Sequence, residues 1–191
     1  MAARTRLRRG YDMDVALAEI YPIVWRLVRV PATIRLANFH RVVQVLMGWD
    51  DYHLHVFSAR STRYGDAGML EDSSVRNEYT ATLRQAVTEA GLEPLVYEYD
   101  FGDGWMCRLT VVHELLGDDL PTRAVCLAGQ RAGPPEDCGG VPGYEMLLDA
   151  MKAPKDEDDR ERLKWLNELY PGYDPAALSV DDMNRKLEEM A

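Results

Sequence analysis

The chain lacks long hydrophobic runs, is poor in cysteine, and beyond its first residues has no cluster of basic side chains. Its 191 residues include 3 cysteines, an odd and small number that argues against a disulfide framework. The longest apolar runs, residues 21–25 and 42–47, are much shorter than a membrane span, and no apolar stretch follows the N-terminal arginines. We therefore expect a cytoplasmic protein with reduced thiols, no membrane segment and no secretory signal.

Basic charge is concentrated at the start of the chain. The formal net charge is −10, yet residues 1–10 hold four arginines and no acidic residue. An acidic body repels nucleic-acid phosphates, which are usually bound by clustered Lys and Arg. Nucleic acid is thus an unexpected partner of the body, and only the N-terminal arm is suited to contact DNA. We expect loose order up to residue 16, with residues 1–11 as a flexible basic N-terminus and residues 12–191 as a single domain.

Hydrophobic periodicity predicts strands and helices that interleave early and helices that gather late. Alternation at every second residue predicts strands, and apolar spacing of three and four residues predicts helices. The expected strands are residues 20–30, 53–59, 95–100 and 105–115, and the expected helices are residues 36–47, 74–90, 144–151, 157–169 and 180–190. Residues 117–143, rich in proline and glycine, are predicted to be irregular. The fold class is therefore α+β, with a mainly antiparallel sheet of about four strands, covered by helices, and a helical C-terminal part.

The most informative segment is residues 97–105, which read Tyr-Glu-Tyr-Asp-Phe-Gly-Asp-Gly-Trp. Asp-Gly between two alternating runs predicts a β-hairpin over residues 95–115, with Tyr97, Tyr99 and Phe101 on one face. A second unusual segment, residues 134–140, reads Pro-Pro-Glu-Asp-Cys-Gly-Gly. Prolines lower the entropy lost on ordering a loop, so we expect this segment to be fixed against the sheet near the hairpin.

Four blocks of sequence, taken in order, carry a family resemblance. They are Pro-Ile-Val-Trp-Arg-Leu with Val-Pro in residues 22–31, Met-Gly-Trp with His-Leu-His-Val-Phe in residues 47–57, the hairpin motif, and residues 134–144. Over roughly residues 12–190 the chain resembles the Ri-plasmid open-reading-frame-three-like (pRiA4b ORF-3-like) proteins, sometimes labelled passenger proteins of mobile elements. The resemblance implies a compact α+β domain and supplies no established activity. It also implies two departures, because this chain has Cys107 where the family usually has histidine, and Gly133 where it usually has cysteine.

Several side chains are candidate ligands of a soft metal ion. Zinc takes about four Cys, His or carboxylate donors, and the candidates are His53, His55, Cys107, Cys126 and Cys138. The spacing contains no Cys-x-x-Cys knuckle, so buried apolar packing of the thiols is the competing interpretation. Because Cys107 shares a predicted strand face with Trp105 and Leu109, we expect it to be buried and metal-free.

The acidic residues of the two motifs also have two interpretations. Asp100 and Asp103 in the hairpin turn, and Glu136 and Asp137 in the proline-rich segment, are suited to acid–base work or to binding a hard cation. Aspartate is equally a standard turn former, and acidic side chains favour the free amides that begin a helical turn.

The leading functional hypothesis is a non-enzymatic binding or interaction module, with an unknown protein or small-molecule partner and no cofactor. Its expected surface joins the hairpin turn to residues 131–144, because loops on a rigid sheet often carry recognition. The candidate residues are Asp100, Asp103, Trp105, Arg131, Glu136, Asp137 and Tyr144. The first alternative is a hydrolase-like enzyme near the 99–107 hairpin, with a divalent metal held by His53, His55, Asp103 and Cys107. The second is a DNA-associated mobile-element protein.

Overall fold

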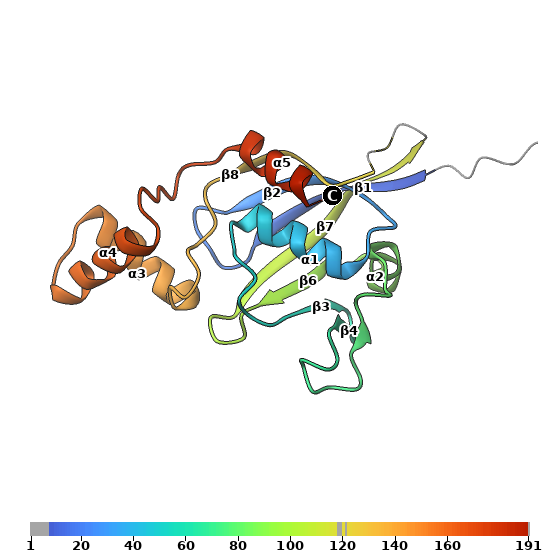
Figure 1. The fold of residues 1–191 in the computed structure, drawn as a ribbon, viewed down its shortest axis with the longest axis horizontal. Helices are drawn as coiled ribbons and strands as arrows, with labels where there is room; N and C mark the ends of the chain where they lie inside the picture. The colour runs from blue at the N-terminus through green and yellow to red at the C-terminus, as the bar shows by residue number, and fades with distance from the viewer. Residues whose placement is uncertain (1–7, 118–119, 121, 191) are drawn as a thin grey trace, which may run out of the picture.

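The structure is a computed structural model that describes residues 8–117, 120 and 122–190. One mixed sheet of 8 strands runs through the molecule, in the order β5-β4-β3-β6-β7-β1-β2-β8 (Figure 1). The strands are β1 (Arg8–Leu17), β2 (Trp25–Pro31), β3 (His55–Ala59), β4 (Thr62–Gly65), β5 (Arg76–Asn77), β6 (Leu95–Tyr99), β7 (Trp105–Gly117) and β8 (Val125–Gln130). The β4–β5 pair is parallel, and the other pairs are antiparallel.

The expected sheet of about four mainly antiparallel strands is therefore wrong. Residues 8–16, expected to be loosely ordered, form most of β1, which lies between β2 and β7. Its inward side chains alternate with Asp12 and Asp14, and Asp12 pairs with Arg29 of β2 at 2.7 Å, so the charge of Asp12 is matched across the sheet. Strand β8 lies in the stretch predicted to be irregular. Strand β5 lies within residues 74–90, which were expected to form a helix, and no strand was expected at β4.

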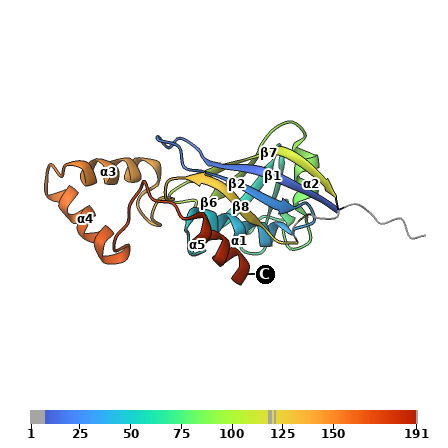
Figure 2. The same ribbon diagram turned by 90° about the horizontal axis from the view of Figure 1, so that it is seen from above.

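The helices cover one face of the sheet and extend beyond one end of it. Helices α1 (Leu36–Met47) and α5 (Val180–Glu189) lie on the same face, while α3 (Gly140–Lys152) and α4 (Glu157–Leu169) pack together past the end of the sheet (Figure 2). Helix α2 (Leu83–Ala90) packs beside β3 and β6. It is shorter than the predicted helix over 74–90, because it begins after Thr82, whose side chain and Gln85 form a capping box.

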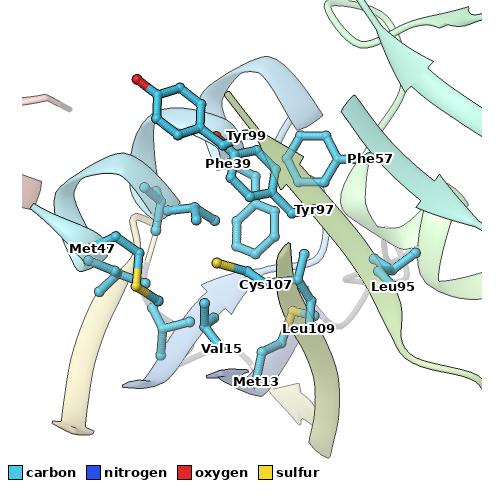
Figure 3. Packing of buried hydrophobic residues seen from close by; sticks show 14 of the residues in the cluster. Met13, Val15, Phe39, Met47, Phe57, Leu95, Tyr97, Tyr99, Cys107 and Leu109 are labelled. Atoms are coloured by element: carbon cyan, nitrogen blue, oxygen red, sulfur yellow. The ribbon is translucent and has the colours of Figure 1, made fainter. Parts of the chain in front are cut away.

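The core lies between α1 and the central strands. Figure 3 shows side chains of α1, Phe39 and Met47, meeting Tyr97, Cys107 and Leu109 from β6 and β7. Cys107 is fully buried, as expected, and burial raises the pKa of its thiol to about 12. The thiol therefore stays protonated at neutral pH and packs as a small apolar side chain.

The predicted hairpin is confirmed. β6 and β7 pair antiparallel, with Tyr99 opposite Trp105 and Tyr97 opposite Cys107. The turn is closed by a hydrogen bond of 2.6 Å from the Gly104 amide to the Asp100 carbonyl. Phe101 does not share the buried face of Tyr97 and Tyr99, because it lies in the turn itself and is 43% exposed.

Within the described residues, none of the helices combines the length and the apolar character needed to span a membrane.

Candidate metal centre

Three loops meet where β3 begins and β6 ends, and together they surround the imidazole of His53. The loop before β3 carries His53, the β6–β7 turn carries Asp100, and the proline-rich segment carries Glu136 and Asp137. The His53 Nε2 atom lies 3.0 Å from Asp137 Oδ1, 3.7 Å from Asp100 Oδ2 and 3.7 Å from Glu136 Oε2. His53 Nε2 thus lies within 3.7 Å of carboxylate oxygens from three residues, and ligand atoms of His53, Asp100 and Asp137 all lie within 4.8 Å of one another.

Two of these carboxylates are each anchored through one oxygen, which leaves the other directed at His53. Asp100 Oδ1 accepts hydrogen bonds from the amides of Gly102 at 2.9 Å and Asp103 at 3.3 Å. Glu136 Oε1 accepts from the Asp50 amide at 2.6 Å and from the Tyr99 hydroxyl at 2.9 Å. The loops therefore orient the second oxygens, as outer hydrogen bonds orient the ligands of a metal ion.

The atoms at the centre of this arrangement lack hydrogen-bond partners. Both His53 Nε2 and Glu136 Oε2 are buried and have no such partner among the described residues; although Asp137 Oδ1 is near His53 Nε2, the geometry is not that of a hydrogen bond. A buried polar atom without a partner costs about 1–3 kcal/mol, and more when it is charged. Ligands at about 2.1 Å from one ion lie about 3–3.4 Å from each other, and the carboxylate oxygens lie 3.0 to 3.7 Å from His53 Nε2. A cation between these atoms would satisfy both of them.

The negative charges of the three carboxylates also favour a bound cation. No Lys or Arg of the described residues forms an ion pair with Asp100, Glu136 or Asp137.

Asp100 and Asp137 also have left-handed backbones, with φ of 55° and 58°. Such conformations cost free energy in a non-glycine residue, although Asp tolerates them better than most, and they cluster at functional sites.

Tyr99 and its neighbours hold the three loops together. Besides donating to Glu136, the Tyr99 hydroxyl accepts from the amide of Tyr52 at 3.0 Å. Burial, followed by the hydrogen bond to Glu136, raises the pKa of Tyr99 above its ordinary value, so it remains a neutral donor. Trp49 stacks on Tyr99 with ring centroids 4.9 Å apart, and its Nε1 donates to the Pro134 carbonyl at 3.1 Å. The expected packing of the proline-rich segment near the hairpin is thereby confirmed.

A second cluster of two histidines and two carboxylates lies beside the first, but its groups bond to one another. His40 Nε2 lies 2.7 Å from Asp51 Oδ1, and His55 Nε2 lies 2.8 Å from Glu78 Oε2. The two imidazoles are stacked, with centroids 3.5 Å apart and planes within 2°. Ring lone pairs lie in the ring planes, so parallel rings do not direct them at one ion. We interpret this cluster as a hydrogen-bond network.

The backbone fixes the proton positions in this network. The Asp51 amide donates to Gln44 Oε1 at 3.0 Å, so the Gln44 side-chain NH₂ is the donor to the Tyr97 hydroxyl at 2.8 Å. Tyr97 then donates to His40 Nδ1 at 2.7 Å, and His40 donates from Nε2 to Asp51. The ring of four residues holds the loop that carries His53.

The other predicted site residues lie elsewhere or have structural roles. Asp103 Oδ2 accepts from the Gly139 amide at 3.2 Å, just before α3, so it joins the turn to that helix. Trp105 and Tyr144 are buried with their rings edge to face, and Tyr144 bonds to the Tyr173 hydroxyl. Arg131 is partly buried, and its Nε has no partner among the described residues.

The structure also separates the cysteines from the histidines. Cys126 lies on β8, where its Sγ donates to the Ala128 carbonyl at 3.5 Å. Cys138 follows Asp137, and burial raises the pKa of its thiol to about 12. All three cysteines are free thiols, and none belongs to either cluster of potential ligands. The site expected from His53, His55, Asp103 and Cys107 is not assembled, since only His53 of these four faces the carboxylates.

The fold agrees with comparisons to known proteins. The family model described as plasmid pRiA4b ORF-3-like protein matches residues 9–182. The chain belongs to this family. A relative, the uncharacterized protein y4hQ of Sinorhizobium fredii, is 33% identical over 181 residues, covering 94% of this chain and 91% of the relative. The crystal structure of MM3350 from Methanosarcina mazei Go1, a protein of unknown function, has a TM-score of 0.77 at 28% identity and covers 92% of this chain and 97% of that one.

The backbone at Gly133 leaves no room for a side chain. A Cβ atom at Gly133 would lie 1.9 Å from the carbonyl oxygen of Met47. A cysteine, which the family resemblance implies at this position, does not fit this backbone.

Proposed function

We propose that this pRiA4b ORF-3-like protein is a binding module that holds a divalent metal ion. The ligands are His53 Nε2, Asp100 Oδ2, Glu136 Oε2 and Asp137 Oδ1. The observation that carries the proposal is the pair of buried atoms without hydrogen-bond partners, His53 Nε2 and Glu136 Oε2, that face each other across 3.7 Å. One imidazole with three carboxylates suits Mn²⁺, Fe²⁺ or Zn²⁺ better than Mg²⁺ or Ca²⁺, which prefer oxygen alone.

The site has one solvent-facing side, which is where a partner would reach the ion. The side chain of Asp137 is 65% exposed, whereas those of Asp100 and Glu136 are 11% and 3% exposed. The neighbouring polar groups are engaged: Tyr99 donates to Glu136, and Asp103 accepts from Gly139. Because neither is left in the position of a general base, a binding role fits the site better than hydrolysis does.

Metal binding can be measured directly on protein stripped with a chelator. In calorimetric titrations with Mn²⁺ and Zn²⁺ we expect one bound ion per chain. The variant Asp137→Asn removes one charged ligand, tolerates the same backbone conformation, and should weaken binding about tenfold or more. Glu136→Gln should do the same.

The matched control is Asp158→Asn, the same chemical change on an exposed residue of α4. It should bind the ion as the wild type does. A folded wild-type protein that binds none of these ions, or an Asp137→Asn variant as tight as the control, would refute the proposal.

Two further expectations remain proposals. A cytoplasmic location is supported by the three free thiols. The DNA-associated alternative depends on residues 1–10, of which residues 1–7 lie outside the described part, while Arg8 and Arg9 begin β1.

A further inference from the structure

Arg26 of β2 is a fully buried cation. Its Nε donates to the Leu46 carbonyl at 2.9 Å, and its Nη1 donates to the carbonyls of Trp25 at 2.7 Å and Gln130 at 3.0 Å. The third nitrogen, Nη2, is buried and has no acceptor among the described residues, and no Asp or Glu of that part of the chain pairs with Arg26. The guanidinium is thus held in place without a counter-charge.

The unpaired positive charge of the Arg26 guanidinium would be stabilised by a bound anion. Burial lowers the pKa of Arg26 to about 10, which still leaves it protonated at neutral pH. Buried charges in proteins are normally paired, because the cost of removing them from water is large. The three carbonyls, one of them at the C-terminal end of α1, offset part of that cost. They do not satisfy Nη2.

A cavity of about 410 Å³ has Arg26 among its lining residues. It lies between the C-terminal end of α1, the segment before Glu136 and the chain that leads into α5. Arg26 lines it together with apolar side chains, which include Val45, Met47, Pro134, Leu178 and Met183. Lys186 also lines it, whereas the lining residue Asp182 pairs with Arg185 at 2.8 Å. The volume is in the range of small-molecule sites, which are mostly apolar with a few oriented polar groups.

The strand next to Arg26 is shaped to admit its side chain. A Cβ atom at Gly129 of β8 would lie 2.7 Å from Arg26 Cδ and 3.1 Å from Leu178 Cδ2. A residue larger than glycine at position 129 would displace Arg26 and Leu178. The absence of a side chain there leaves room for the arginine side chain next to the cavity.

We propose that this cavity binds a small organic carboxylate with an apolar body. The carboxylate accepts hydrogen bonds from Arg26 Nη2, Lys186 adds positive charge, and the apolar body packs on Met47, Leu178 and Met183. This cavity shares no lining residue with the proposed metal ligands, although Pro135 directly precedes Glu136.

The probes are octanoate, octan-1-ol of the same chain length, and acetate, each titrated by calorimetry with a chelator present so that metal plays no part. Octanoate should bind wild-type protein about tenfold or more tightly than octanol, since only the carboxylate pairs with the buried guanidinium. Acetate should bind much more weakly, because it lacks the apolar body.

Two variants test the charge and the cavity separately. Arg26→Met should abolish the preference for octanoate, and a buried charge replaced by an apolar side chain of similar size often leaves a protein folded. Ala177→Trp, at an exposed position on the cavity wall, should block octanoate and octanol alike even if the first variant fails to fold. Arg160→Met, on the exposed surface of α4, is the matched control and should bind octanoate as the wild type does.

Octanoate bound about equally by the wild type and Arg26→Met would overturn the proposal. Equal affinities of the wild type for octanoate and octanol would also overturn it. So would a lack of octanoate binding, or octanoate binding that Ala177→Trp leaves unchanged. If only peptides with acidic side chains bind, the cavity serves a protein partner and the small-molecule proposal is wrong.

Discussion

Lowering the pH should destabilise this protein through His40, at pH values that are still too high to protonate most carboxylates. Burial, and then the neighbouring His55, lower the pKa of His40 from 6.5 to about 4 in the folded protein. The folded state therefore holds His40 neutral in a pH range where the unfolded chain would protonate it. A group with a lowered folded pKa gives stability that is complete above pH 6.5 and is lost as the pH falls toward 4.

The hydrogen-bond network shows why the neutral form is required. Tyr97 donates to His40 Nδ1, so a proton on that nitrogen would face the hydroxyl proton of Tyr97. A charged His40 would also stack on the ring of His55 at 3.5 Å. A shift from 6.5 to about 4 corresponds to about 3 kcal/mol in total, of which about 2 kcal/mol should be lost between pH 7 and pH 5.

The assay is urea unfolding followed by tryptophan fluorescence at a series of pH values between 7 and 4.5. The variant His40→Gln keeps a donor near Asp51 but cannot titrate. Its free energy of unfolding should therefore be lower than that of the wild type at pH 7 and should change less with pH. His113→Gln, whose side chain is 69% exposed, is the control and should follow the wild type. A wild-type curve that is flat between pH 7 and 5, or as steep in His40→Gln as in the wild type, would refute the reasoning.

Two further predictions concern packing. Cys107→Ala should lower the free energy of unfolding by about 1 kcal/mol, as small core truncations do, and leave metal content unchanged; a loss of bound metal in this variant would contradict the proposed ligand set. Gly133→Ala should cost about 3 kcal/mol or more by chemical denaturation, because the new Cβ would lie 1.9 Å from the Met47 carbonyl oxygen. The control Gly117→Ala, where a Cβ meets nothing within 4 Å, should cost far less, and equal costs would show that the segment adapts freely.

Local pattern was sufficient where local forces decide the structure. The apolar spacing of residues 36–47 gave the bounds of α1, and Gly48 ends that helix in a left-handed conformation with φ of 80°. Residues 157–169 form α4 as predicted, and Asp156 caps it by accepting from the Asp159 amide. The hairpin turn followed from its Asp-Gly pair.

Strand number could not be predicted in the same way. β5 has 2 residues and β4 has 4, too few for an alternation to be visible; β4 exists because β3 offers an edge to pair with, and β5 because β4 offers the next one. β1 was missed because arginines and aspartates interrupt its apolar residues, and those charges are matched only once β2 lies alongside. Pairing partners distant in sequence decide such strands.

The same division holds for the candidate site. The sequence by itself marked the hairpin turn and the proline-rich segment as the unusual loops, and it placed Asp100, Glu136 and Asp137 among the candidates. It grouped His53 with His55, because a strand would direct both to one face. The structure starts β3 at His55, so His53 lies in the preceding loop and turns to the carboxylates, while His55 pairs with Glu78. Which donors converge depends on how loops are held by Tyr99 and the His40 network, and those are long-range contacts that no local pattern encodes.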